Sequence, residues 1–216
     1  MRIVVPHPRD PGILPEPRVL PTREPTRGDD GPLTRLVEPS GPIDIGTRDG
    51  IKTLLLEGDL VTVDLGVARV LGESKVAVPG HAWVARHVDM GNPHAVAFVE
   101  DEATLAGLDL RVPPDHDPAT YPDGVNVELV VRRGDVHVGM RVHERGSGET
   151  RSCGTGAGAV MVATAVADGA DPTVTGRQAM YRVDVPGGML ALTWSPEGHV
   201  YLTGPAVIVA RGTTSL

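Results

Sequence analysis

The chemistry of this sequence is concentrated around its single cysteine, Cys153. Glycine, serine and threonine surround this residue, and an apolar run without proline, 157–167, follows it. The run predicts a buried helix over residues 154–168, about three to four turns long and closed by Gly169. Cys153 would then lie at a helix start, where unpaired N–H groups and the helix dipole favour negative charge. We expect its thiol to ionise more easily than usual, and the thiolate is the reactive form.

The same helix start is a candidate binding site for an anionic ligand. The backbone N–H groups of Gly154 and Thr155 would have no partner inside the helix and can hold a carboxylate or a phosphate. A lone cysteine is more often a small buried hydrophobic residue. Cys153, however, lies between Ser152 and Gly154, with no apolar residue directly beside it. These surroundings favour a reactive thiol over a structural one.

Three further groups of polar residues interrupt apolar stretches and are candidate ligand contacts. An Asn-Pro-His segment supplies Asn92 and His94, although alone these are more often a turn residue and a buried strand residue. Asn126 lies between two valines, and a ligand contact and an exposed strand position are equally good interpretations. Glu144 and Arg145 come shortly before the cysteine. A surface ion pair is the simpler interpretation, and recognition of an ammonium and a carboxylate is the functional one.

The segments that position these residues are short strands joined by tight turns. The apolar residues from Val136 to Val142 alternate cleanly, which predicts one buried strand face. The small residues of the central helix would let strands approach it on all sides. We therefore expect an α+β fold, a curved sheet wrapped around a central helix. Predicted strands cover 51–57, 60–65, 81–88, 95–99, 125–131, 136–143, 181–185, 189–194, 199–203 and 206–210, with a short helix at 102–108 and a loop at 111–123.

Residues 1–42 differ in composition from the rest of the chain. They hold ten of its 20 prolines and show neither a helix nor a strand period. Proline at this density blocks helices and central strands. We expect this segment to be disordered or extended.

Composition also excludes several classes of function. The net charge is −8 and no Lys/Arg cluster occurs, which argues against nucleic acid as the main partner. The longest apolar run is too short to span a bilayer, and no signal peptide is evident at the N-terminus. One cysteine excludes an intrachain disulfide and suggests a reducing compartment. We expect a cytoplasmic protein that neither binds nucleic acid nor enters a membrane.

Four segments, in order along the chain, resemble the diaminopimelate epimerase family. They are residues 89–96, 121–128, 141–157 and 201–207, and the third, which contains the cysteine, is highly specific. The likeness covers about residues 46–212. It implies a diaminopimelate-epimerase-like curved mixed β-sheet around a central helix, with one near-complete domain of the usual two.

The resemblance implies a cofactor-free isomerase, with no metal, that interconverts LL- and meso-diaminopimelate on the route to lysine and peptidoglycan. The family uses two cysteines on opposite faces of the α-carbon, one removing the proton and the other returning it. Cys153 resembles the second of these, the usual proton acceptor, and His94 and Glu144 resemble residues that adjust the thiol pKa values. The residues that resemble substrate contacts are Asn92, Asn126, Glu144, Arg145, Gly154 and Thr155.

The chain departs from the family pattern in its first part. The family's Gly-Asn-Asp-Phe segment and its Cys-Gly-Asn-Gly segment, which carries the other cysteine, are absent. Residues 1–42 are not similar to the family, 43–68 resemble remnant strands of the first domain, 69–200 the second domain, and 201–212 a closing strand. We expect the remnant and closing strands to lack partners, which would expose apolar edges and favour association, for example as a homodimer.

One thiol can remove and return a proton on one face only. We therefore expect a truncated or mis-started epimerase that exchanges the α-proton without efficient inversion. Two rival classes stay open. In a Cys–His hydrolase, His94 or His143 would activate Cys153. In a non-catalytic remnant, the same residues would only bind a ligand.

Overall fold

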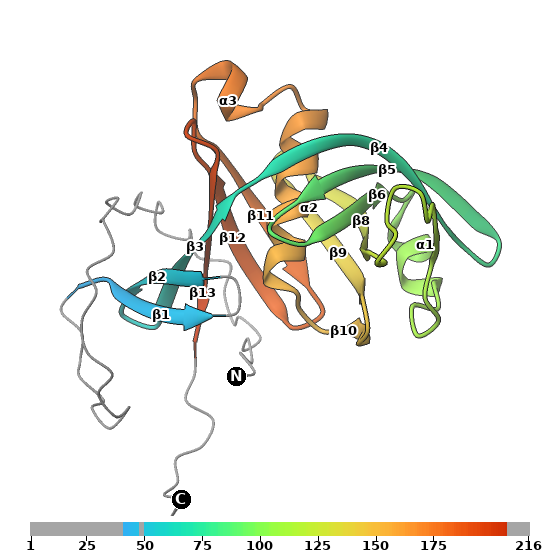
Figure 1. The fold of residues 1–216 in the computed structure, drawn as a ribbon, viewed down its shortest axis with the longest axis horizontal. Helices are drawn as coiled ribbons and strands as arrows, with labels where there is room; N and C mark the ends of the chain where they lie inside the picture. The colour runs from blue at the N-terminus through green and yellow to red at the C-terminus, as the bar shows by residue number, and fades with distance from the viewer. Residues whose placement is uncertain (1–40, 48–49, 207–216) are drawn as a thin grey trace, which may run out of the picture.

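The computed structural model describes residues 41–47 and 50–206 of the chain. Within these residues, 13 strands form one mixed sheet that curls around the helix α2 (Gly154–Ala167), as Figure 1 shows. Two shorter helices are α1 (Glu102–Gly107) and α3 (Pro172–Thr175). The expected α+β architecture, a curved sheet around a central helix, is confirmed.

Most neighbouring strands are antiparallel, and two pairs, β6 with β8 and β9 with β11, are parallel. Their order across the sheet is β1-β2-β3-β13-β12-β11-β9-β8-β6-β5-β4-β7, with β10 beside β9. The strands are β1 (Ile43–Thr47), β2 (Gly50–Glu57), β3 (Leu60–Val67), β4 (Arg69–Val78), β5 (His81–Asp89), β6 (Pro93–Phe98), β7 (Asp115–His116), β8 (Asn126–Gly134), β9 (His137–Glu144), β10 (Gly148–Thr150), β11 (Ala179–Val185), β12 (Gly188–Trp194) and β13 (His199–Pro205).

The helix α2 is the centre of the main hydrophobic core. Residues 156–165 are buried on every side of it, and it contacts β5, β6, β8, β9, β11, β12 and β13. Its small residues make this enclosure possible, because a side chain at Gly158 would lie 3.1 Å from Leu65 Cδ1. The helix ends beside Gly169, which has a φ of 68° and donates its N–H to Val166. The helix predicted over 154–168 is therefore confirmed to within one residue.

A second core lies on the opposite face of the sheet. It joins residues of β4, β5, β6 and β8 to Leu105 of α1 and to Leu110 and Tyr121 of the segment that follows α1. Strands β6 and β8 are consequently buried on both faces. The predicted alternation holds for Val138, Met140 and Val142 in β9, but it is wrong for Val136, which is exposed because it precedes the strand.

Some strands were not predicted. Strand β4 contains Gly72, Glu73, Ser74 and Lys75, which give no apolar period, and it pairs with β5 and with the two-residue β7. Residue 206 follows β13 without being part of a strand, and residues 207–210 of the predicted strand 206–210 and 207–212 of the closing strand lie outside the described residues. So do residues 1–40 of the proline-rich segment.

The expectation that β3 and β13 lack partners is wrong. Strand β13 pairs with β3 over the whole of its length, with Leu202 opposite Val63, and β3 also pairs with β2. The sheet is therefore continuous from β1 to β7. Exposed apolar side chains do occur, as expected, on the first two strands, at Ile45, Ile51 and Leu56. The division at residues 43–68, 69–200 and 201–212 stays a prediction.

Candidate active site

The first turn of α2 faces three strands that carry polar side chains in register. His94 of β6 is opposite Asn126 of β8, and Glu128 is opposite Val142 of β9. Val142 and Val130 belong to the core around α2. Because side chains two residues apart in a strand share a face, the polar residues of β6 and β8, together with the Glu144 position of β9, face α2.

Cys153 is the N-cap residue of α2. It has extended backbone dihedrals, and its sulfur accepts the Gly156 N–H at 3.3 Å and lies 3.6 Å from Thr155 Oγ1. The sulfur thus takes the place that a serine or threonine oxygen usually has at a helix start. Among the described residues, no acceptor takes the N–H groups of Gly154 and Thr155, and Gly154 is exposed. The predicted anion-binding donors are therefore without an acceptor in the described part of the chain, and they lie beside the thiol.

The thiol itself is buried, with an exposed fraction of 7%. Burial raises the pKa of Cys153 to about 12, and the carboxylates of Glu128 and Glu144 act in the same direction. The Thr155 hydroxyl and the Gly156 N–H lower the pKa, but less. The sequence-based expectation of an easily ionised thiol is wrong for this state, because desolvation and two carboxylates outweigh the helix start.

His94 is fully buried and uses both ring nitrogens. Nδ1 lies 2.7 Å from Glu128 Oε1, and Nε2 lies 3.1 Å from Asn92 Oδ1. Among the described residues, no hydrogen bond joins a histidine to Cys153. His94 can therefore influence the thiol only through Glu128, to which it is bonded.

Asn126 is buried and links two segments of the site. Its Oδ1 accepts the Arg145 N–H at 2.9 Å, and its Nδ2 donates to the Pro93 carbonyl at 3.3 Å. Of the two interpretations, the exposed strand position is wrong because Asn126 lies in a central strand with an exposed fraction of 5%. One amide hydrogen remains after these bonds.

Glu144 and Arg145 begin the turn that leads to the cysteine. Thr150 donates a hydrogen bond to Glu144 Oε1, and the Ser147 N–H closes the turn on the Glu144 carbonyl. Arg145 is exposed and donates to the Asp123 carbonyl at 3.0 Å. Within the described residues, Glu144 and Arg145 do not form an ion pair with each other. Both side chains can therefore bind a charged ligand.

Glu128 is the site residue that sequence reasoning missed. It is fully buried between the valines and leucine of β8. The signal was present, because glutamate is almost never fully buried without a partner, and this one interrupts an apolar strand.

His143 does not support the hydrolase interpretation. It alternates with Val142 and therefore points away from α2, and its Nδ1 lies 2.7 Å from the Leu110 carbonyl. With His94 bound to Glu128 and Asn92, neither histidine is placed as the direct base of Cys153.

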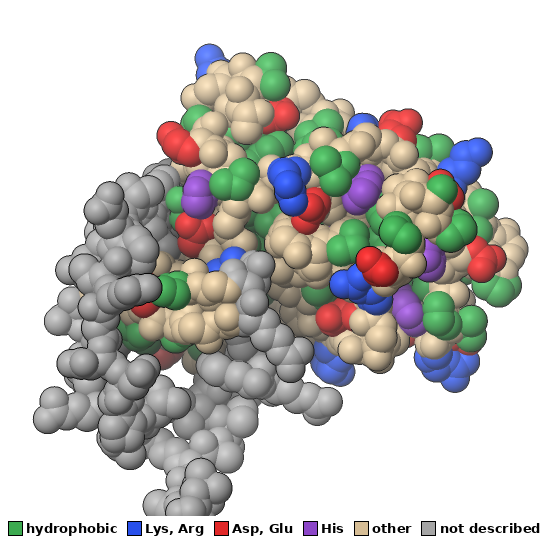
Figure 2. Space-filling model, in the orientation of Figure 1, with side chains coloured by type: hydrophobic (Ala, Val, Ile, Leu, Met, Phe, Trp, Pro, Cys, Tyr) green, Lys and Arg blue, Asp and Glu red, His purple; other side chains and the backbone are tan. Residues whose placement is uncertain are grey.

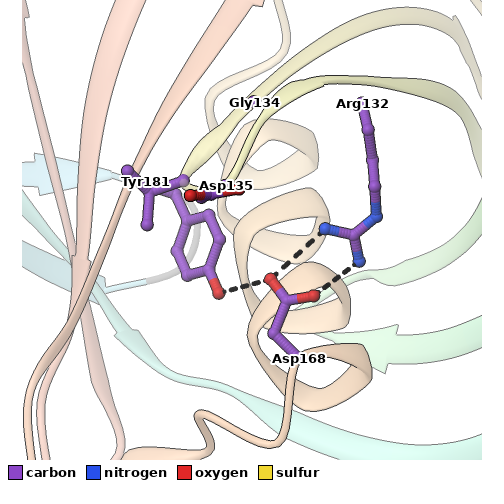
Figure 3. Close-up of a pocket in the computed structure, with 6 residues that line it drawn as sticks. Arg132, Gly134, Asp135, Asp168 and Tyr181 are labelled. Carbon is purple, nitrogen blue, oxygen red and sulfur yellow. Dashed lines mark hydrogen bonds and ion pairs between the residues drawn. The ribbon is translucent and has the colours of Figure 1, made fainter.

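A cavity of about 570 Å³ lies at the other end of α2. Figure 3 shows that Asp168, which follows the helix, binds both Arg132 and Tyr181 there, with Tyr181 donating to Asp168 Oδ2 at 2.7 Å. None of the candidate site residues lines this cavity, and its main polar groups satisfy one another. It is therefore not the site that the sequence predicts.

Two further observations concern the described part of the chain. It contains no group of three His, Cys, Asp or Glu side chains placed to hold a metal ion. Its helices are all too short, or too polar, to cross a bilayer.

The fold is shared with solved structures of the racemase and epimerase class. One is a probable proline racemase from Agrobacterium radiobacter K84, with a TM-score of 0.57 and 16% sequence identity over 84% of this chain and 62% of that one. At this identity the likeness shows the fold alone. The chain therefore has the fold of this class, a sheet wrapped around a central helix, and it carries a thiol at the start of that helix.

Sequence comparison gives the particular family. The family profile described as diaminopimelate epimerase matches residues 86–209. The chain is 60% identical over 176 residues to diaminopimelate epimerase of Streptomyces coelicolor, and 47% identical over 152 residues to that of Mycolicibacterium smegmatis. The chain belongs to the diaminopimelate epimerase family. The alignment with the Streptomyces protein covers 80% of this chain and 60% of that protein. The alignment with the Mycolicibacterium protein covers 70% of this chain and 50% of that protein. The chain therefore spans little more than half the length of these relatives.

Proposed function

We propose that the chain carries one acid–base half of a diaminopimelate epimerase site, on the route to lysine and peptidoglycan. Cys153 removes the α-proton of diaminopimelate and returns a proton to the same face. The observation that carries the proposal is the thiol at the N-cap of α2, directly beside the open N–H groups of Gly154 and Thr155. These donors would hold the α-carboxylate, into which the electron pair of the broken C–H bond delocalises.

The charged residues of the turn fit the two ends of an amino-acid centre. Glu144 is half-buried beside the thiol and suits the α-ammonium, whereas the exposed Arg145 suits a carboxylate. An ammonium bound at Glu144 would offset one of the two carboxylates that raise the pKa of Cys153. Substrate binding would thus favour the thiolate at the moment when a base is needed.

Inversion of a stereocentre needs an acid and a base on opposite faces. The 216 residues contain one cysteine, so we propose exchange with retention as the activity of this chain by itself. The test is incubation with LL-diaminopimelate in heavy water, followed by mass spectrometry and chiral chromatography. We expect α-deuteration without accumulation of the meso form.

The matched control is Cys153→Ala, which should abolish deuteration while keeping the fold. Fast epimerisation by the chain alone would refute the retention mechanism. A melting temperature raised by diaminopimelate, with no deuteration at any pH, would instead support the non-catalytic binding interpretation.

We also infer a cytoplasmic protein that acts on a free amino acid and binds neither nucleic acid nor a membrane. The net charge of −8 supports this, and basic and acidic side chains are intermingled on the face that Figure 2 shows. Self-association as a homodimer is part of the proposal. Its support is the exposed apolar side chains of β1 and β2, Ile45 and Ile51. Sedimentation would test it, with Ile51→Lys as the variant expected to be monomeric.

A further inference from the structure

Among the described residues, Glu128 is the one carboxylate that is fully buried, with an exposed fraction of 0%. Its Oε1 lies 2.7 Å from His94 Nδ1, whereas its Oε2 has no hydrogen-bond partner in the described part of the chain. A buried carboxylate with one unpaired oxygen is destabilising. Its neighbours in β8 are apolar, so packing alone gives no reason for a glutamate here.

The carboxylate lies against the first turn of α2. A Cβ atom at Gly156 would lie 2.7 Å from Glu128 Oε1 and 3.1 Å from Cys153 Sγ. These two distances put the oxygen within about 6 Å of the sulfur, the range over which one charge shifts the ionisation of another. The glycine is therefore what allows the carboxylate to approach the thiol.

His94 and Glu128 form one hydrogen-bonded pair close to the thiol. Both ring nitrogens of His94 are engaged, Nδ1 by Glu128 Oε1 and Nε2 by Asn92 Oδ1, so the imidazole is held in one orientation. Both groups are fully buried, so solvent does not screen the pair. Its charge distribution acts directly on the sulfur.

We propose that Glu128 is a positioning residue for Cys153 that, together with His94, fixes the charge beside the sulfur and so sets the pH at which the thiol ionises. The role in catalysis rests on the proposed function, but the effect on the thiol does not. Glu128 differs from Glu144, which is half-exposed and open to a ligand. Glu128 is instead sealed in the core and bonded to His94.

The other groups around the pair are few. Glu144 faces the thiol from β9. From α2, the Gly156 N–H donates to the sulfur and Thr155 Oγ1 lies 3.6 Å from it. On the opposite face of the sheet, burial lowers the pKa of His87, with a contribution from His94. Burial likewise raises the pKa of Tyr121, with a contribution from Glu128.

The test is the pH dependence of alkylation of Cys153 by iodoacetamide, since it is the sole cysteine. Glu128→Gln keeps the shape and can still bond to His94 but removes the charge. We expect the midpoint to move to lower pH by about one unit, which gives about tenfold more thiolate at any pH below it. The matched control is Glu149→Gln, because Glu149 pairs with Arg141 and does not act on the thiol. Its profile should be unchanged.

A folded Glu128→Gln protein with an unshifted profile would overturn the proposal, even if it melted at lower temperature, because a purely structural role predicts that result. If this variant does not fold, the native protein still decides. In ¹⁵N-histidine NMR, the His94 nitrogens should shift as Cys153 ionises, and this shift should vanish in Cys153→Ala. No such shift would overturn the proposal. A shifted alkylation profile without α-deuteration would support the role of Glu128 and refute the proposed activity.

Discussion

Three glycines at alternate positions of α2 allow one mutation series to test the geometry of the site. They are Gly154, Gly156 and Gly158, and a methyl group added at each would meet different neighbours. At Gly156 it would lie 2.7 Å from the buried Oε1 of Glu128, which is a clash. The carboxylate cannot simply swing away, because it is fully buried and bonded to His94. Gly156→Ala should therefore disturb both the helix and the thiol.

The magnitude follows from opposing effects. Replacing glycine by alanine inside a helix stabilises it by about 1 kcal/mol. Overpacking destabilises by about 1–3 kcal/mol, and weakening the charged hydrogen bond between Glu128 and His94 destabilises by about 1.5–3 kcal/mol more. These effects leave a net loss of about 1.5–5 kcal/mol. We expect Gly156→Ala to be less stable by about 3 kcal/mol, which lowers the melting temperature by about 6–12 °C for a chain of this size.

The two neighbouring glycines are the controls. At Gly154 the added methyl group would be 3.7 Å from Leu202 Cδ1, an ordinary contact, so Gly154→Ala should stay within about 0.5 kcal/mol of the native protein. At Gly158 it would meet the flexible ends of Leu65 and Met90 at 3.1 and 3.2 Å. The helix gain and the crowding should nearly cancel there, within about 1 kcal/mol.

Urea denaturation of all three variants measures these differences, and alkylation of Cys153 reports on the site in the same samples. If Gly156→Ala is as stable as Gly154→Ala and its thiol titrates as in the native protein, Glu128 does not lie against the helix start. The argument from the close approach of carboxylate and sulfur would then be refuted.

Three further outcomes are expected. The pKa of Cys153 is raised from 9.0 to about 12, so the folded state holds this proton more tightly than the unfolded state. This stabilisation is complete below about pH 9 and is lost as the pH rises toward 12, and the total loss is about 4 kcal/mol. In alkaline denaturation curves, the native protein should therefore lose more stability than Cys153→Ala. Asn126→Leu removes both bonds of the side chain to the Arg145 and Pro93 backbones, and calorimetry should show a loss of about 1–3 kcal/mol and no diaminopimelate binding. Thr150→Val removes the hydroxyl that binds Glu144; it should keep the fold and slow α-deuteration several-fold.

The sequence predicted most helices and strands whose apolar pattern and turn residues match their burial in the structure. The apolar run after Cys153 forms α2, and the Gly58-Asp59 and Pro186-Gly187 turns join the predicted hairpins. Strand β4 was missed because an edge region can be polar, and Val136 was misplaced because alternation does not show where a strand begins. Local propensity cannot detect these features.

The candidate site was predicted as a set of residues but not as a set of interactions. Asn92, His94, Asn126, Glu144 and Cys153 are brought to one end of α2, as the resemblance implied. The pKa of the thiol was predicted in the wrong direction because a helix start is visible in a sequence, whereas burial is not. The nearby carboxylate of Glu128 comes from a strand distant in sequence, and only tertiary structure shows its approach.

The enclosure of α2 has a consequence for how the protein is made. Strands β11, β12 and β13 cover the helix but follow it in the chain, and β13 pairs with β3, more than a hundred residues earlier. A ribosome therefore releases an apolar helix before the strands that cover it exist. Until β13 has been synthesised, this nascent segment exposes apolar surface. Slowed or interrupted translation after α2 should therefore yield aggregates or chaperone-bound chains.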